Sequence, residues 1–336
     1  MAGLLALLTA CGGGGDGSVA PLAPRLPASP TSPPSSIVTS TDAPAYPAGS
    51  EELAAYSLLN AERNRCGFGL LAANAALDAA ARAHADYLII NSLSTHLEYE
   101  TLYPDGFTGA DPATRIKAQG YLDAGGVTDE FASFTTSAPV QSKIDIGELG
   151  IRALLNAPYH LNGLMTGYRD MGVAVRSNAD TGRGSRGIFV QINAAYKASA
   201  GPQLLGESDV KTYPCDGATG INRQLTNETP NPVPGRDLGT SPLGSSVYIA
   251  VREGKQLVMT SAAMTHALTG QAVTLRAPVG AANDPYGPCA QGCFGRHQAY
   301  IAADAPLQAN TPYIVMISGS SNGTAFSRSF TFTTGS

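Results

Sequence analysis

Helical periodicity is confined to the first two thirds of this chain, and only short β segments follow a polar seam. Residues 51–65 and 74–91 carry apolar residues at helical spacing, with Asn74 as an N-cap candidate. The seam, residues 216–233, is rich in Gly, Asn, Thr and Pro. A chain of 336 residues suits about two domains. We therefore expect one domain over residues 51–215, a linker over 216–233 and a second domain over 234–336.

The first of these regions mixes helices and strands. "IGELGIRALLNAPYHLNGLM" has a helical pattern broken at Pro158, whereas "DMGVAVRS" and "RGIFVQINAAY" predict two strands joined by a polar turn. Residues 97–150 are rich in Gly, Asp and Pro and predict mainly loops. Helices and hairpin strands without β-α-β alternation indicate an α+β fold.

The last region is all β by the same criteria. "SSVYIAV", "KQLVMTS" and "QAVTLRAP" are each bounded by Gly, Pro or Asp, and "SSNG" separates "TPYIVMISG" from "AFSRSFTFTT". Several short strands at this spacing indicate a small β-sandwich. The final hairpin resembles the last hairpin of bacterial Ig-like modules, which implies that residues 234–336 form such a module.

The N-terminus carries an export pattern. "MAGLLALLTAC" is a short apolar run that ends in small residues before Cys11, and it resembles the lipobox of bacterial lipoproteins, although no Lys or Arg precedes the run. The resemblance implies a signal peptide over residues 1–10 and a lipid on Cys11. Residues 11–50 are rich in Gly, Pro and Ser and predict a flexible tether. We expect a membrane-anchored protein of the cell envelope, at the outer membrane or the cell surface.

The four remaining cysteines predict two disulfides in an exported chain. Four cysteines allow three pairings, and the division into domains favours Cys66–Cys215 and Cys289–Cys293. The C-x3-C pattern of the second pair, with His297 at the same spacing, also resembles a metal cluster. An oxidising compartment favours the disulfide.

Composition excludes some classes of function. The net charge is −5 and the pI is about 5.5, so the chain lacks the basic surface of a nucleic-acid-binding protein. The chain has no H-E-x-x-H or P-loop motif, and no G-x-S-x-G or G-x-G-x-x-G pattern stands between a predicted strand and a predicted helix. Any chemistry must therefore come from residues that are scattered along the chain.

The segment "LLNAERNRCGFGLLAANAALDAAARAHADYLIINSLSTH" resembles the beginning of the CAP superfamily, which includes cysteine-rich secretory proteins, antigen 5 and pathogenesis-related proteins. "RIKAQGYLDAGGVTDEF", "NAPYHLNGLM", "MGVAV" and "FVQINA" resemble later motifs of the same family, so the match spans residues 51–197. The resemblance implies an α-β-α sandwich. His84 lies on the packing face of the second predicted helix, and we expect it in the core.

In that family two histidines and one or two glutamates line a central cleft. Motif by motif, the resemblance places His96, Glu130 and His160 there, and Glu148 is a candidate for the second acid although its local motif does not match. Phe131 stands where the family has Asn. Imidazoles and a carboxylate suit a divalent metal such as zinc, and they can also organise a cleft without metal.

These observations lead to one expected function and two rivals. We expect an exported, lipid-anchored CAP-domain protein that binds a small apolar ligand such as a lipid or sterol, a metal, or a protein partner. The first rival is a metal-assisted hydrolase of peptidase type, with Glu130 as base and a water held by His96 and His160. The second rival is a structural or adhesive envelope protein.

Overall fold

Two stretches of the chain build different architectures in the computed structural model, which describes residues 36–135, 142–178, 187–287 and 293–336. We call residues 51–197 the helical region and residues 210–336 the β region. The expected mixture of helices and strands is confirmed. The predictions for Cys11 and for the Cys289–Cys293 pair fall outside the described residues.

The helical region is built on a four-stranded sheet with the order β1-β3-β4-β2. Its strands are β1 (Ala72–Ala73), β2 (Ala124–Thr135), β3 (Asp170–Ser177) and β4 (Gly187–Lys197). Strand β4 pairs antiparallel with both β2 and β3, and β1 pairs parallel with β3. The strands predicted in "DMGVAVRS" and "RGIFVQINAAY" are confirmed. The 12-residue strand β2 lies in a stretch predicted as loop, and that prediction was wrong because Gly125 and Gly126 masked the pattern that follows them.

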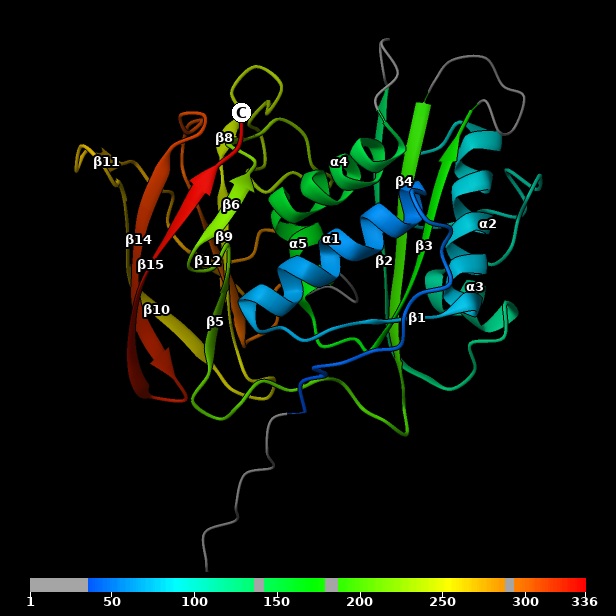
Figure 1. Ribbon diagram of the computed structural model, residues 1–336, viewed down its shortest axis with the longest axis horizontal. Helices are drawn as coiled ribbons and strands as arrows, with labels where there is room; N and C mark the ends of the chain where they lie inside the picture. The colour runs from blue at the N-terminus through cyan, green and yellow to red at the C-terminus, as the bar shows by residue number, and fades with distance from the viewer. Residues whose placement is uncertain (1–35, 136–141, 179–186, 288–292) are drawn as a thin grey trace, which may run out of the picture. The chain divides into compact units, whose positions relative to one another are not determined.

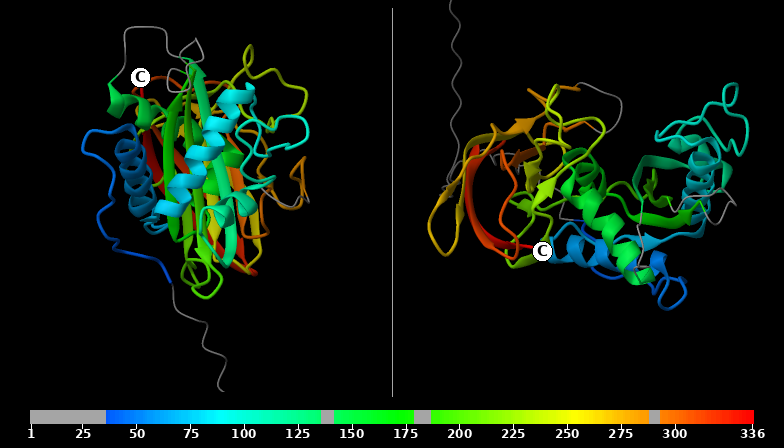
Figure 2. Two further views of the ribbon diagram at one scale, coloured as in Figure 1. Left: turned by 90° about the vertical axis from the view of Figure 1, so that its right-hand side faces the viewer. Right: turned by 90° about the horizontal axis from the view of Figure 1, so that it is seen from above.

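Helices cover both faces of this sheet (Figures 1 and 2). Helix α2 (Ala75–Asn91) packs on β3 and β4, and α3 (Pro112–Ala118) lies beside it. Helices α1 (Glu51–Cys66), α4 (Lys143–Asn156) and α5 (Pro158–Met165) lie on the other side. The predicted break at Pro158 is confirmed, because α4 ends at Asn156 and Pro158 is the first residue of α5.

The helix ends follow from local chemistry. Ser50 caps α1 by accepting the Leu53 amide, and Gly67 ends the helix in the left-handed conformation. The side chain of Asn74 accepts the amides of Ala76 and Leu77, so the predicted N-cap of α2 is confirmed. Helix α5 is the exception, since Ala157 at its N-cap has no side chain that could accept these N–H groups.

The β region consists of two larger sheets and one small ribbon. The five-stranded sheet has the order β11-β10-β14-β15-β6, the four-stranded sheet β12-β13-β9-β5, and β7 pairs with β8. The strands are β5 (Val210–Tyr213), β6 (Ala218–Ile221), β7 (Gln224–Leu225), β8 (Leu243–Gly244), β9 (Ser246–Val251), β10 (Leu257–His266), β11 (Ala272–Val273), β12 (Val279–Gly280), β13 (Gln298–Ala302), β14 (Pro312–Ser321) and β15 (Thr324–Thr334).

The C-terminal hairpin is confirmed as β14 and β15. Tyr313 lies opposite Phe332 and Val315 opposite Phe330, and all four side chains are buried. The segment predicted as a linker, residues 216–233, contributes β6 and β7 to these sheets. These two strands were not predicted, because the segment is polar and each strand is at most four residues long.

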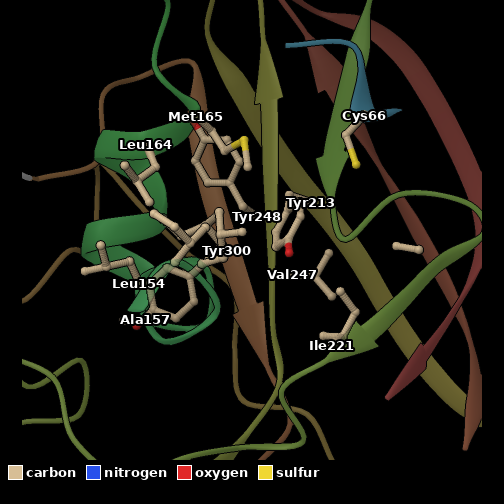
Figure 3. Close-up of a cluster of buried hydrophobic side chains, with 14 of the residues drawn as sticks. Cys66, Leu154, Ala157, Leu164, Met165, Tyr213, Ile221, Val247, Tyr248 and Tyr300 are labelled. Carbon is tan, nitrogen blue, oxygen red and sulfur yellow. The ribbon is translucent and has the colours of Figure 1, made fainter. Parts of the chain in front are cut away.

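One hydrophobic core extends through both regions (Figure 3). Leu154, Leu164 and Met165 of the helical region belong to the same buried cluster as Val247 and Tyr300 of the β region. Residues 34–336 form one compact unit. The predicted disulfide Cys66–Cys215 is confirmed and joins the end of α1 to the start of the β region, across 149 residues of sequence.

Part of the predicted tether is docked on the fold. Val38 donates its amide to the side chain of Gln203 (2.7 Å) and accepts the amide of Leu70 (2.9 Å). The Tyr46 hydroxyl donates to Asp78 (2.6 Å). Specific hydrogen bonds therefore hold residues 36–50 against the fold. In a flexible tether the same groups would be bonded to water. Among the described residues, no helix is both long enough and apolar enough to cross a membrane.

Candidate functional site

A cavity of about 760 Å³ lies where the helical region meets the β region. The helical region contributes residues of β2 and α5 and the segment that follows α2, and the β region contributes residues of β9 and of segments 229–230 and 293–298. Much of the lining is aromatic or aliphatic, including Phe68, Met165, Tyr168, Leu205 and Tyr248. The volume and this lining fit a small organic molecule.

Three of the four residues predicted for the site meet at this cavity. His96, Glu130 and His160 all line it, and the ring centroids of the two histidines are 6.1 Å apart. The ring of Phe131, the residue after Glu130, lies 5.0 Å from the His96 ring between centroids. The fourth candidate, Glu148, lies on α4 outside the cavity, where it pairs with Arg152 at 3.6 Å.

His96 is held by a buried network within the helical region. Its Nδ1 lies 2.9 Å from Oδ1 of Asp129, whose Oδ2 accepts from Arg115 at 2.8 Å. Burial alone would raise the pKa of Asp129. The hydrogen bond from His96 and the positive charges of His84 and Arg115 instead hold that pKa well below its usual range. Asp129 is therefore a carboxylate, and it accepts the proton on Nδ1 of His96.

The network continues to the core histidine. His84 is fully buried as expected, with Nδ1 at 2.9 Å from Glu98 and Nε2 at 3.1 Å from the Thr95 carbonyl. Glu98 also accepts the amide of Thr108 (2.6 Å), which ties down the loop after α2. His84 thus packs, but it packs as a member of a charged cluster and not as an apolar filler.

His160 is held from the β region. Glu228 is buried, and its Oε1 accepts the backbone amide of Tyr159 at 2.7 Å and lies 3.3 Å from Nδ1 of His160. Glu228 supplies the acceptor that Ala157 cannot offer to the N-terminus of α5. Burial raises the pKa of Glu228, and the hydrogen bond from His160 opposes that rise.

The protonation of His160 follows from the same contacts. Burial alone would lower the pKa of His160, but the hydrogen bond to Glu228 and the charge of Glu130 raise it. Because Oε1 of Glu228 already accepts a backbone N–H, it is an acceptor toward the imidazole as well. Nδ1 of His160 therefore carries a proton, and its Nε2 is the nitrogen left for the cavity.

Glu130 lies on β2 against the backbone of α5. Oε1 accepts from the Thr128 hydroxyl at 2.5 Å, and a methyl group added at Gly163 would overlap this carboxylate. Burial raises the pKa of Glu130 to about 6, although the charges of His160 and His96 oppose the rise. A glycine at position 163 is therefore required for the carboxylate to lie where it does.

The residues present only partly fit the predicted metal. Two imidazoles whose Nδ1 atoms are fixed by carboxylates are the usual chemistry of zinc ligands. In the described part of the chain, however, no group of three or more His, Cys, Asp or Glu side chains is arranged to hold a metal ion.

Sequence reasoning missed the residues that orient the histidines. Asp129 directly precedes Glu130 and could have been suspected from that position, whereas Arg115 begins the segment "RIKAQGYLDAGGVTDEF" and nothing there marks it as a partner of Asp129. Glu228 lies in the segment predicted as a linker, and no local pattern marks it. His297, considered for a metal cluster, also lines the cavity, and burial lowers its pKa to about 4.

Comparison with known proteins gives little beyond this geometry. No family model and no curated protein matches the chain. Among solved structures, it is similar to an extracellular protein containing a SCP domain from Bacillus anthracis str. Ames, with 18% identity and a TM-score of 0.32. The similarity covers 44% of this chain, and the chain spans 40% of the length of that structure.

Proposed function

We propose that this chain is an exported CAP-like protein that binds a small, largely apolar ligand in the cavity between its two regions. The observation that carries the proposal is the meeting of His96, Glu130 and His160 at one cavity, although 34 and 30 residues separate them along the sequence. The motifs that resemble the CAP superfamily pick out the same three residues. The layered arrangement of helices and sheet around them supports an α-β-α sandwich of that kind.

The shape and chemistry of the cavity support binding over catalysis. The lining combines polar groups, which are the two histidines and Glu130, with aromatic rings such as Phe68 and Tyr248. Both Nδ1 atoms contact carboxylates, and among the described residues no Ser or Cys side chain is hydrogen-bonded to either ring. The arrangement suits an amphipathic molecule with a polar head and an apolar body.

Export and anchoring belong to the same proposal. The disulfide Cys66–Cys215 requires an oxidising compartment to persist, which supports a place outside the cytoplasm. The lipobox-like sequence supports a lipid on Cys11 and attachment to the cell envelope. The β region, which belongs to this proposal as an Ig-like module and spacer, also forms one wall of the cavity.

The first test is occupancy of the cavity by a neutral probe. Ala250 lies on β9, is buried and lines the cavity, so Ala250→Leu narrows it. We expect the full-length wild-type protein to bind Nile red with an increase in fluorescence, and Ala250→Leu to weaken this binding at least tenfold. Ala282→Leu, an exposed site outside the cavity, is the matched control and retains wild-type affinity. Equal affinity in the two variants would contradict the proposal.

Zinc binding and metal-assisted hydrolysis remain rival predictions with their own test. Calorimetric titration of zinc into the wild-type protein and into a His96→Ala, His160→Ala double variant addresses both. Tight binding that the double variant loses would favour the hydrolase. Binding of the same strength in both proteins, or in neither, would remove zinc from this site.

A further inference from the structure

We propose that Ile37 contacts the apolar part of the ligand, and that a bound ligand therefore holds the segment around Ile37 more tightly against the fold. We call residues 36–38 the strap. This inference rests on the proposed function and adds a ligand contact from a part of the chain that precedes both the helical region and the β region.

Ile37 belongs to the wall of the cavity. Its side chain is partly buried, lines the cavity and packs against the hydrophobic core that extends through both regions. Ser36 and Val38, on either side of it, are also partly buried but do not line the cavity. A ligand in the cavity therefore meets one side chain of the strap, and that side chain is apolar.

Hydrogen bonds fix the strap on both sides of Ile37. Ser36 donates its amide to the carbonyl of Leu204 (3.0 Å), and its hydroxyl oxygen accepts the amide of Leu204 (2.7 Å). On the other side, Val38 donates its amide to Oε1 of Gln203 and accepts the amide of Leu70. Main-chain contacts before and after Ile37 thus hold it at the cavity wall.

Gln203 connects the strap to the rest of the wall. Its side chain is buried and lines the cavity. While Oε1 accepts from Val38, Nε2 donates to the carbonyls of Leu70 (2.8 Å) and Tyr168 (2.6 Å). Tyr168 is itself a lining residue. Release of the strap would remove the partner of a buried amide oxygen, which favours the docked position.

The surface around Ile37 is closely packed and apolar. A methyl group added at Gly69 would overlap the amide of Gln203 and lie 2.9 Å from Cγ2 of Ile37, so the strap lies directly against this backbone. The cavity is also lined by Phe68, which precedes Gly69, and by Leu205, which follows the strap's partner Leu204. These neighbours indicate that Ile37 meets the apolar part of a ligand and not its polar group.

Contact between the ligand and Ile37 couples two equilibria. A ligand that binds more tightly when the strap is docked must favour docking by the same factor. Local opening of the strap exposes the amides of Ser36 and Val38 to exchange with solvent. A bound ligand should therefore slow the exchange of these two amides.

The test is amide hydrogen exchange in the full-length protein with and without saturating Nile red, read by mass spectrometry over peptides that contain Ser36 and Val38. We expect Nile red to slow exchange at these residues by about fivefold or more, which is the factor by which docking strengthens binding. Unchanged exchange while Nile red is bound would overturn the inference.

Two matched truncations separate Ile37 from its neighbour. Ile37→Ala keeps the backbone bonds of the strap and should weaken Nile red binding by about fivefold, because apolar contact area is lost. At equal occupancy, Nile red should then slow exchange by less than about twofold relative to the ligand-free variant.

Val38→Ala is the control, because it shortens a strap side chain that does not line the cavity. It should retain both the affinity and the slowing of exchange seen in the wild type. Equal behaviour of the two variants would overturn the inference.

The same measurements distinguish the two proposals. If Nile red binds and Ala250→Leu weakens it, but exchange at Ser36 and Val38 does not change, the cavity binds ligands and only the role of Ile37 fails. If Nile red does not bind at all, the proposed function itself fails, and the inference fails with it.

Discussion

His96 and His160 face the same cavity, but different parts of the molecule hold them. His96 depends on Asp129 and Arg115, which lie within the helical region and are almost wholly buried. His160 depends on Glu228, which comes from the β region, 68 residues farther along the chain. One half of the site could persist in the helical region by itself, whereas the other half requires the β region to be docked.

This difference assigns the β region a role in the site. A module that only spaced the helical region from a membrane would contribute no buried carboxylate to a site histidine. Here Glu228 both orients His160 and accepts an amide at the start of α5. The predictions below separate the two halves, beginning with the largest expected effect.

The disulfide between the two regions gives the largest effect. A loop of 149 residues corresponds to about 5 kcal/mol of chain entropy removed from the unfolded state. We expect the Cys66→Ala, Cys215→Ala double variant to lose stability approaching that amount, measured by equilibrium denaturation in guanidinium chloride. Reducing agent should shift the midpoint of this variant less than that of the wild type. A loss below about 1 kcal/mol would mean that the cross-link does not limit the unfolded chain.

Removing Arg115 should damage the His96 half. Arg115 is fully buried beside Asp129 and Glu98, so Arg115→Met leaves uncompensated buried charge at a cost of about 3–5 kcal/mol. Urea denaturation measures this loss. Lys143→Met removes the exposed pair with Glu51 and should cost no more than about 1 kcal/mol. Similar losses in both variants would contradict a special role for the buried network.

Acid should act on the same half through Asp129. Its folded-state pKa lies well below the unfolded value of about 3.9, so its contribution to stability is complete above that value. As the pH falls below about 4 toward the folded pKa, the contribution is lost. We expect the unfolding free energy of the wild type to fall more steeply between pH 5 and pH 3 than that of Asp129→Asn. Parallel slopes for the two proteins would contradict this.

Glu228 variants act on the His160 half with a smaller effect. Glu228→Ala removes the acceptor for buried amides at the start of α5 and should cost about 1–3 kcal/mol. Glu228→Gln should lose less stability than Glu228→Ala, because its side-chain carbonyl still accepts the amide of Tyr159. When the His160 ring is neutral, nitrogen-15 NMR should show its proton on Nδ1 in the wild type. This tautomer preference should be weaker in Glu228→Ala, and the tautomer of His96 should not change. A shift of both histidines together would mean that the two halves are not independent.

Local sequence patterns predicted the elements well where the pattern was complete. Asn74 precedes a helix, Pro158 separates two helices, and the alternation at Tyr313 and Val315 defines a strand. Strand β2 was missed because glycines begin it. The short strands β6 and β7 were missed because pairing partners more than 15 residues away, and not their own composition, make them strands.

The candidate site likewise contains residues that local motifs predicted and residues that only the structure placed. Motifs within the sequence named His96, Glu130 and His160, because each stands in a short recognisable segment. The same approach included Glu148, which the structure places outside the cavity beside Arg152.

The sequence by itself therefore determined the helices α1, α2, α4 and α5, the C-terminal hairpin and which histidines to consider, whereas α3 lies in the stretch predicted as mainly loops. Only the tertiary structure decided how those histidines are oriented, through Asp129 and Glu228, and that the cavity has a wall from the β region. The physical reason is the separation along the chain over which each interaction acts. Caps and periodicity act over a few residues, whereas a buried carboxylate finds its partner only when segments far apart in the chain pack together and exclude water from both.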